Sequence, residues 1–323
     1  MTAVPHLTPG KENEPARKLG TFFLWTALFM VIPLGRLRDL FGPGALVCGY
    51  VVYVALFAAA VWRVGATKTN AGLIREQPPY LPGVLLLAGP LALLLGASVT
   101  GEPTASRPGD YVLNTTALLV GSLVLIGGLV VLSVKLWEAG QRLLPALGLA
   151  GLVSGAAVWL ANLVFRYAIV ASGASGLQAE AEDQAWVANE YLRGLEGTPS
   201  WIDLLLVWTD MLQLTYVVLA YLATAALGAS LVRADWLGRF GGGVFTGLNV
   251  ALAFTAISGV ILAGYGSAAG AWTAYVLTIP FMVFVLPYFL GAVLLSSKAA
   301  ERTLPMDDFA ADTTVAGVVR EPR

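Results

Sequence analysis

Histidine and cysteine each occur only once in this sequence, as His6 and Cys48. His6 precedes the first apolar segment, so a bis-histidine haem, a histidine-ligated zinc ion and a Ser-His-Asp triad are all excluded within the apolar segments. One cysteine cannot form a disulfide within the chain or a cysteine-based metal site. We therefore expect no metal and no cofactor.

Charge is also scarce. Only 12% of the residues are charged, against roughly a quarter in an average soluble domain, while 57% are hydrophobic and the mean hydropathy is +0.75. The net charge of -1, with lysine and arginine scattered between hydrophobic runs, excludes a nucleic-acid partner. There is no Walker A pattern, and no lysine in the middle of an apolar run could form a retinal Schiff base. The composition instead predicts an all-α integral membrane protein whose main partner is the lipid bilayer.

Long apolar runs account for most of the chain. Crossing about 30 Å of hydrocarbon takes roughly 20 helical residues, and eight runs approach or exceed that length: 19–34, 45–62, 81–99, 112–134, 144–171, 202–232, 243–263 and 271–295. They predict a polytopic bundle of about eight transmembrane helices at 19–297. A polar leader at 1–18 precedes the bundle, and a tail at 298–323, rich in small polar and acidic residues, is expected to be disordered.

The basic residues between these runs predict the orientation of the chain. If the N-terminus is cytoplasmic, the outer segments hold only Arg36, Arg38, Arg107 and Arg193, and the inner segments hold the other interhelical and terminal basic residues: Lys11, Arg17, Lys18, Arg63, Lys68, Arg75, Lys135, Arg142, Arg233, Arg239, Lys298, Arg302, Arg320 and Arg323. The positive-inside rule then places both termini in the cytoplasm of a cell-membrane protein. An even number of spans likewise requires both termini to lie on the same side of the membrane.

One long outer segment, 172–201, is acidic. Within it, apolar and aromatic residues recur at three- and four-residue steps from Trp186 to Leu195, which indicates a short amphipathic helix. Such a helix lies on the membrane surface or covers the mouth of the bundle as a lid, and the surface location is the commoner of the two.

Two pairs of similar sequence segments suggest an internal duplication. The motif L-S-x-K-x-x-E occurs at Leu132 and again at Leu295, and "YVV" opens apolar stretches at Tyr50 and Tyr216. The offsets are about half of the chain, as expected of two four-helix halves in parallel orientation. Apolar helices that end in a basic residue resemble one another by composition alone, so chance similarity remains the rival explanation.

Two opposite charges interrupt the apolar runs at similar depths. Arg166 lies about five residues, or about 8 Å, from the outer end of its run, and Asp210 about eight residues, or about 12 Å, from the start of the next. We expect the two side chains to form an ion pair, because each is costly alone in lipid. Asn162 and Gln213 lie one helical turn deeper and form a second polar level. This ladder is a substrate-binding site or proton relay, or it only holds the helices together.

Proline and glycine patterns give weaker signals. Pro280 and Pro287 lie seven residues apart in the last run, so both would kink the helix on one face and form a hinge or only a bend. Two small-xxx-small patterns, "GLVSG" at 151–155 and "GVFTG" at 243–247, predict close helix contacts.

Two functions from different classes fit these patterns. The first is a small-solute or ion transporter whose cavity is lined by Asn162, Arg166, Asp210 and Gln213. The second is a non-transporting membrane scaffold or regulatory subunit. An enzyme is the least favoured class, and no catalytic residue is assigned, because Asp210 is the only acid deep in a run and a two-aspartate mechanism lacks its second member.

Overall fold

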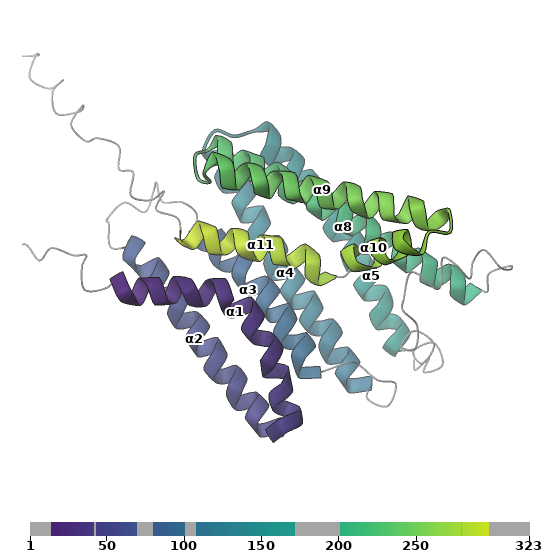
Figure 1. Cartoon of the computed structure of the whole chain (residues 1–323), viewed down its shortest axis with the longest axis horizontal. Helices are drawn as coiled ribbons and strands as arrows, with labels where there is room; N and C mark the ends of the chain where they lie inside the picture. The colour runs from purple at the N-terminus through teal and green to yellow at the C-terminus, as the bar shows by residue number, and fades with distance from the viewer. Residues whose placement is uncertain are drawn as a thin grey trace, which may run out of the picture.

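The structure, a computed structural model, describes residues 14–41, 43–69, 80–100, 108–171, 201–278 and 280–296. Nearly all of these residues are helical and none of them forms a strand, which confirms the all-α class. Figure 1 shows the helices: α1 (Glu14–Phe41), α2 (Pro43–Thr69), α3 (Tyr80–Thr100), α4 (Pro108–Glu138), α5 (Leu143–Ala171), α8 (Trp201–Arg233), α9 (Arg239–Gly264), α10 (Ala268–Thr278) and α11 (Pro280–Ser296).

Five helices are long and apolar enough to cross a membrane over their described residues: Gly44–Val64, Val112–Glu138, Leu143–Val164, Met211–Arg233 and Arg239–Gly264. The apolar parts of α3 and α11, Tyr80–Gly96 and Val283–Ser296, are shorter. Large apolar side chains also point outward from the bundle, including Val51 at 65% exposed and Phe254 at 63%. Water would disfavour so much exposed apolar surface, whereas lipid accommodates it. The membrane assignment from composition therefore holds.

Helices α3 and α4 pack as a hairpin at a glycine contact. A Cβ placed on Gly89 of α3 would lie 2.7 Å from the backbone nitrogen of Leu125 in α4, and one on Gly121 of α4 would lie 2.8 Å from the carbonyl oxygen of Gly89. The two backbones can approach this closely only because neither glycine carries a side chain.

The two predicted small-residue patterns differ in outcome. Gly151 and Gly155 of "GLVSG" both face α8, as expected. Gly243 and Gly247 of "GVFTG" meet no atom within 4 Å among the described residues, so this second pattern does not bring α9 close to another described helix. Both patterns satisfy the same composition rule, and the rule does not say which face of a helix is covered.

The first and last expected spans differ from single straight helices. Figure 1 shows α1 bent and continuing beyond Pro33 to Phe41, where the apolar run was expected to end at Leu34. The last run, 271–295, is divided between two helices: α10 ends at Thr278 and α11 begins at Pro280. Pro280 explains the separation, because proline lacks the backbone N–H that a continuous helix needs, disfavours the helical conformation of the residue before it and is well suited to begin α11.

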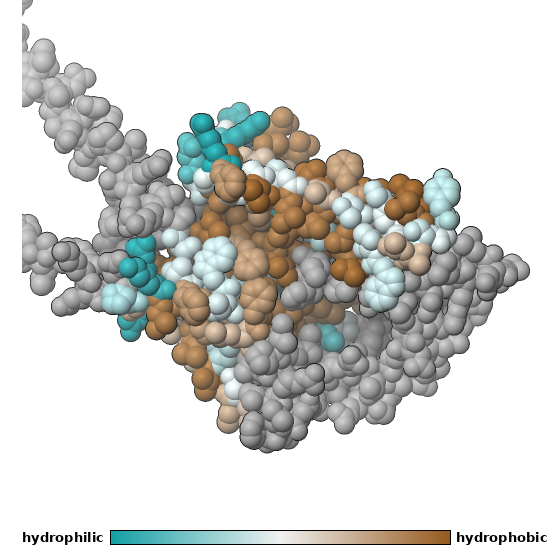
Figure 2. Space-filling view, in the orientation of Figure 1, coloured by the Kyte–Doolittle hydropathy of each residue, from teal (hydrophilic) through white to brown (hydrophobic). Residues whose placement is uncertain are grey.

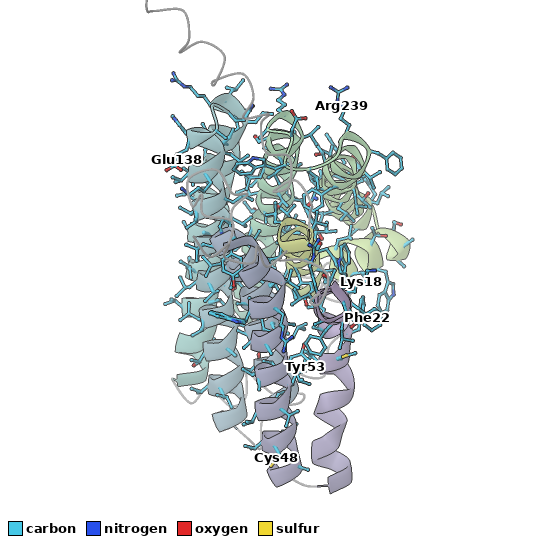
Figure 3. All side chains as sticks on the ribbon, turned by 90° about the vertical axis from the view of Figure 1, so that its left-hand side faces the viewer. Lys18, Phe22, Cys48, Tyr53, Glu138 and Arg239 are labelled. Carbon is cyan, nitrogen blue, oxygen red and sulfur yellow. The ribbon has the colours of Figure 1, made fainter. Side chains whose placement is uncertain are left out.

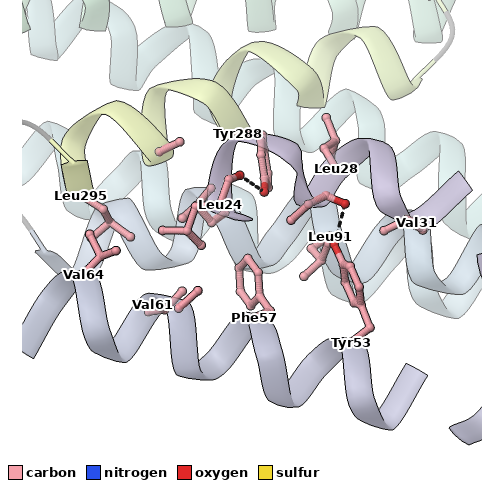
Figure 4. Close-up of a cluster of buried hydrophobic side chains, with 14 residues drawn as sticks. Leu24, Leu28, Val31, Tyr53, Phe57, Val61, Val64, Leu91, Tyr288 and Leu295 are labelled. Carbon is pink, nitrogen blue, oxygen red and sulfur yellow. Dashed lines mark hydrogen bonds between the residues drawn. The ribbon is translucent and has the colours of Figure 1, made fainter. Parts of the chain in front are cut away.

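The N-terminal core joins α1, α2 and α3 to α11, which is far away in sequence (Figure 4). The hydroxyl of Tyr288 in α11 donates a 2.6 Å hydrogen bond to the carbonyl of Leu24 in α1, and the hydroxyl of Tyr53 in α2 donates one of the same length to Ala27. Gly83 of α3 lies against Leu295 and Gly291 of α11. The last helix is thereby packed into the first half of the chain.

The described charges gather at one end of the bundle, which we call the basic end. The connections 139–142 and 234–238 lie there, and every lysine or arginine whose side chain the structure describes is at this end: Arg17, Lys18, Arg63, Lys135, Arg142, Arg233 and Arg239. Figure 3 shows Glu138 and Arg239 at the same end and Cys48, near the start of α2, at the other. In Figure 2 most of the strongly hydrophilic surface likewise lies at the upper left and left edges, and most of the remaining described surface is apolar or intermediate.

Candidate functional site

Helices α5 and α8 pack in a regular antiparallel register. The positions of Gly148, Gly151 and Gly155 lie against Leu227, Ala223 and Leu219 in turn. The ring of Trp159 then stacks on the ring of Tyr216, with centroids 4.8 Å apart and an interplanar angle of 23°. Each step of three or four residues along α5 is therefore matched by a step of three or four residues back along α8.

Continuing this register by one step places Asn162 level with Gln213. Both side chains are buried, at 0% and 4% exposed. The predicted second polar level thus lies inside the bundle and on two packed helices. Amide side chains in such a place are stable only when they are hydrogen-bonded.

One further step places the backbone of Arg166 in α5 level with that of Asp210 in α8. Their side chains lie outside the described part of the structure, so the ion pair itself stays a prediction. The same holds for the acidic segment at 172–200, the leader at 1–13 and the tail at 297–323, which lie outside the described residues.

The Trp159–Tyr216 stack lies directly below the Asn162–Gln213 level. The indole Nε1–H of Trp159 donates a 2.8 Å hydrogen bond to Oγ of Ser122 in α4, and this hydroxyl donates in turn to the carbonyl of Leu118 at 2.6 Å. The sequence did not predict this network, although Trp159 lies three residues before Asn162 and Tyr216 three residues after Gln213. Their depth and the facing Ser122 could not be obtained from either helix alone.

A small cavity lies beyond the stack, between α4, α5, α8 and α11. Its volume of about 20 Å³ has room for roughly one water molecule. Ser122, near the middle of the α4 sequence, is one of its lining residues, which places the cavity near mid-depth. The lining is mostly apolar and consists of Ser122, Leu125, Ile126, Leu129, Leu152, Gly155, Ala156, Tyr216, Ala220, Thr224, Val283, Phe284 and Pro287.

The two prolines proposed as hinge residues have different locations. Pro280 begins α11, whereas Pro287 lies inside that helix and is buried. Because proline has no backbone N–H, the carbonyl of Val283, four residues earlier, loses its usual helical donor. Val283 and Pro287 both line the cavity, so the weak point of α11 lies at the cavity wall. Whether the segment moves as a hinge stays a prediction.

Two of the hydroxyl side chains that line the cavity, Ser122 and Thr224, can offer a guest only acceptor lone pairs. Thr224 donates its hydroxyl hydrogen to the carbonyl of Ala220 at 2.7 Å, and Ser122 donates to Leu118, so each hydroxyl oxygen offers only lone pairs to a guest. Among the described residues, no group of three or more His, Cys, Asp or Glu side chains could hold a metal ion. The cavity has room for about one water molecule, and its described lining contains no nucleophile–base pair.

No family model matches the sequence, and neither the curated proteins nor the solved structures include a significant match. The function is therefore argued from the geometry of the site alone.

Proposed function

We propose that this protein is a small-solute or ion transporter of the cell membrane. The observation that carries the proposal is the mid-depth cavity, one wall of which is formed by Val283, Phe284 and Pro287 of α11, the second of the two helices into which the last apolar run is divided. Membrane transporters commonly bind substrate near the bilayer midplane beside discontinuous helices. Interrupted backbone is tolerated in lipid where it is buried in protein or lines a cavity.

In this proposal the solute enters from the end opposite the basic end and first meets the polar ladder of α5 and α8. Arg166 binds an anionic group of the solute or Asp210 exchanges a proton, and Asn162 and Gln213 supply hydrogen bonds one turn deeper.

The finer topology belongs to the same proposal. Counting α10 and α11 as one interrupted span gives eight spans: α1, α2, α3, α4, α5, α8, α9 and α10–α11. The basic end is then cytoplasmic and holds both termini, as the positive-inside rule requires. The two-halves arrangement has mixed support, because α1 with α2 and α5 with α8 form similar hairpins, whereas α8 packs along α9 much more closely than α2 packs on α3.

A ligand screen followed by a flux assay tests the proposal. The purified full-length chain is heated in detergent with small carboxylates, inorganic phosphate and zwitterionic amino acids. A solute that binds the folded state raises the melting temperature in a concentration-dependent manner. We expect Arg166→Leu to abolish that increase and Arg142→Leu, an exposed arginine at the basic end, to retain it.

The stabilising solute is then loaded into proteoliposomes. Transport requires efflux above that of protein-free liposomes and a loss of efflux in Arg166→Leu. A solute that binds but never crosses, or an efflux that is indifferent to Arg166→Leu, contradicts the proposal.

A second candidate is a non-transporting scaffold, and the exposed face of α9 favours it. Only 22% of the apolar stretch of α9 is buried, the smallest share among the five helices that are long enough to cross a membrane. Its unoccupied Gly243 and Gly247 suit close packing with a helix of another protein. A transport-negative protein that forms crosslinks from α9 to a partner would favour this candidate.

A further inference from the structure

We infer that the stacked pair Trp159 and Tyr216 is the barrier that separates the outer polar ladder from the mid-depth cavity. This inference rests on the proposed function, because it assigns the residues that control access to the transport site.

The position of the pair supports this assignment. Asn162 and Gln213 lie three residues away on the outer side of the stack, and Gly155 and Ala156, on the other side of Trp159, line the cavity. The two aromatic side chains are 2% and 6% exposed and their rings are in stacking contact. On the facing surfaces of α5 and α8, the stacked rings therefore lie between the Asn162–Gln213 level and the cavity.

The pair is also held in a way that permits opening. Trp159 is buried in a hydrophobic cluster, and stacking on Tyr216 and one hydrogen bond fix the orientation of its indole; among the described residues the acceptor of that bond is the hydroxyl of Ser122. Ser122 lines the cavity, so a molecule that enters there competes for the hydroxyl that fixes Trp159. An interaction of this modest strength can break and re-form during a transport cycle.

Cysteine accessibility tests the barrier without a known substrate. The native thiol is first removed by Cys48→Ser, and single cysteines are then introduced as Gln213→Cys on the outer side or Thr224→Cys in the cavity wall. Thr224 follows Tyr216 by eight residues, about 12 Å along the helix, and is 3% exposed. A charged, membrane-impermeant methanethiosulfonate is applied to the end opposite the basic end.

Gln213 is 4% exposed and Thr224 3%, so neither reacts freely in this conformation. With Trp159 present, we expect Gln213→Cys to react slowly, when the outer side of the bundle opens during the transport cycle, and Thr224→Cys to stay protected. Adding Trp159→Ala should raise the reaction rate of Thr224→Cys by about tenfold or more, because the stack and the hydrogen bond are both lost. Ser122→Ala leaves the ring in place and should give a smaller increase. It also tests the barrier if Trp159→Ala fails to fold. The matched control is Trp25→Ala, which removes another stacked ring, that of Trp25 on Phe289 with centroids 5.5 Å apart; neither residue lines the cavity.

The outcomes separate this inference from the proposed function. Reaction of Thr224→Cys while Trp159 is intact, or protection that persists in both Trp159→Ala and Ser122→Ala, overturns the barrier but leaves the outer site intact. No reaction at Gln213→Cys means that the ladder is closed to water, and this result overturns both proposals.

Discussion

The hydroxyl of Tyr288 donates a 2.6 Å hydrogen bond to the carbonyl oxygen of Leu24, across 264 positions of the sequence. Figure 4 shows this bond beside that of Tyr53 with Ala27, within the core shared by α1, α2, α3 and α11. Both acceptors are backbone carbonyls of α1. The first helix of the chain is therefore fixed on two sides, by its hairpin partner and by the last helix.

Removing the first of these hydroxyls tests its contribution. Tyr288→Phe retains the ring and should lower the free energy of unfolding by about 1 kcal/mol, since interhelical hydrogen bonds in membranes are worth about that much or less. The measurement is denaturation by dodecyl sulfate in mixed micelles. Tyr265→Phe, at an 86% exposed position, should change nothing, and equal effects of the two variants would contradict a role for the Leu24 contact.

Two glycines of α4 provide a matched test of the α3–α4 contact. Gly121→Ala places a methyl group 2.8 Å from the carbonyl oxygen of Gly89 and 2.9 Å from Leu93, whereas Gly127→Ala in the same helix meets nothing within 4 Å among the described residues. We expect Gly121→Ala to destabilise by about 1–3 kcal/mol and Gly127→Ala to be neutral or to stabilise by up to about 1 kcal/mol. Thermal unfolding of both variants measures this difference in stability. Similar melting temperatures would show that α3 can move away from α4 at little cost.

Hydropathy predicted most helices because each needs only its own residues to be recognised. The run 112–134 lies within α4 and the run 202–232 within α8. Hydropathy could not predict which helices pack against one another. The proline rule indicated a kink near Pro280, but the displacement of α11 onto α3 depends on Gly83 and Gly291, which are distant in sequence.

The proposed transport site makes a prediction for Arg166 and Asp210. If the two groups line a hydrated vestibule, Arg166→Leu and Asp210→Leu should each change the unfolding free energy by less than about 1 kcal/mol, because water solvates the remaining charge. A double-mutant cycle read by thermal unfolding measures this. Large losses in the single variants that the double variant restores would identify a sequestered structural pair and favour the scaffold instead.

The candidate site could be predicted only in part from the sequence. Helical spacing placed Asn162 and Gln213 at one level, because an antiparallel hairpin brings equal depths together. It gave no sign of the cavity, whose wall also requires Ser122 from α4 and Pro287 from α11. A site made by four helices depends on which faces meet, and apolar surroundings leave no periodic pattern to indicate those faces.

Pro287 is the residue with which the hinge can be tested. Pro287→Ala supplies the N–H that the carbonyl of Val283 lacks and so makes α11 a more regular helix. We expect the stability of this variant to stay within about 1 kcal/mol of the wild type, since the gained hydrogen bond offsets the lost ring contacts, while efflux of the solute identified above falls sharply. Pro90→Ala makes the same change in α3, where the proline is also buried but does not line the cavity, and should retain efflux. Full efflux in Pro287→Ala would mean that this proline only bends α11, and the moving segment would then have to be the break before Pro280.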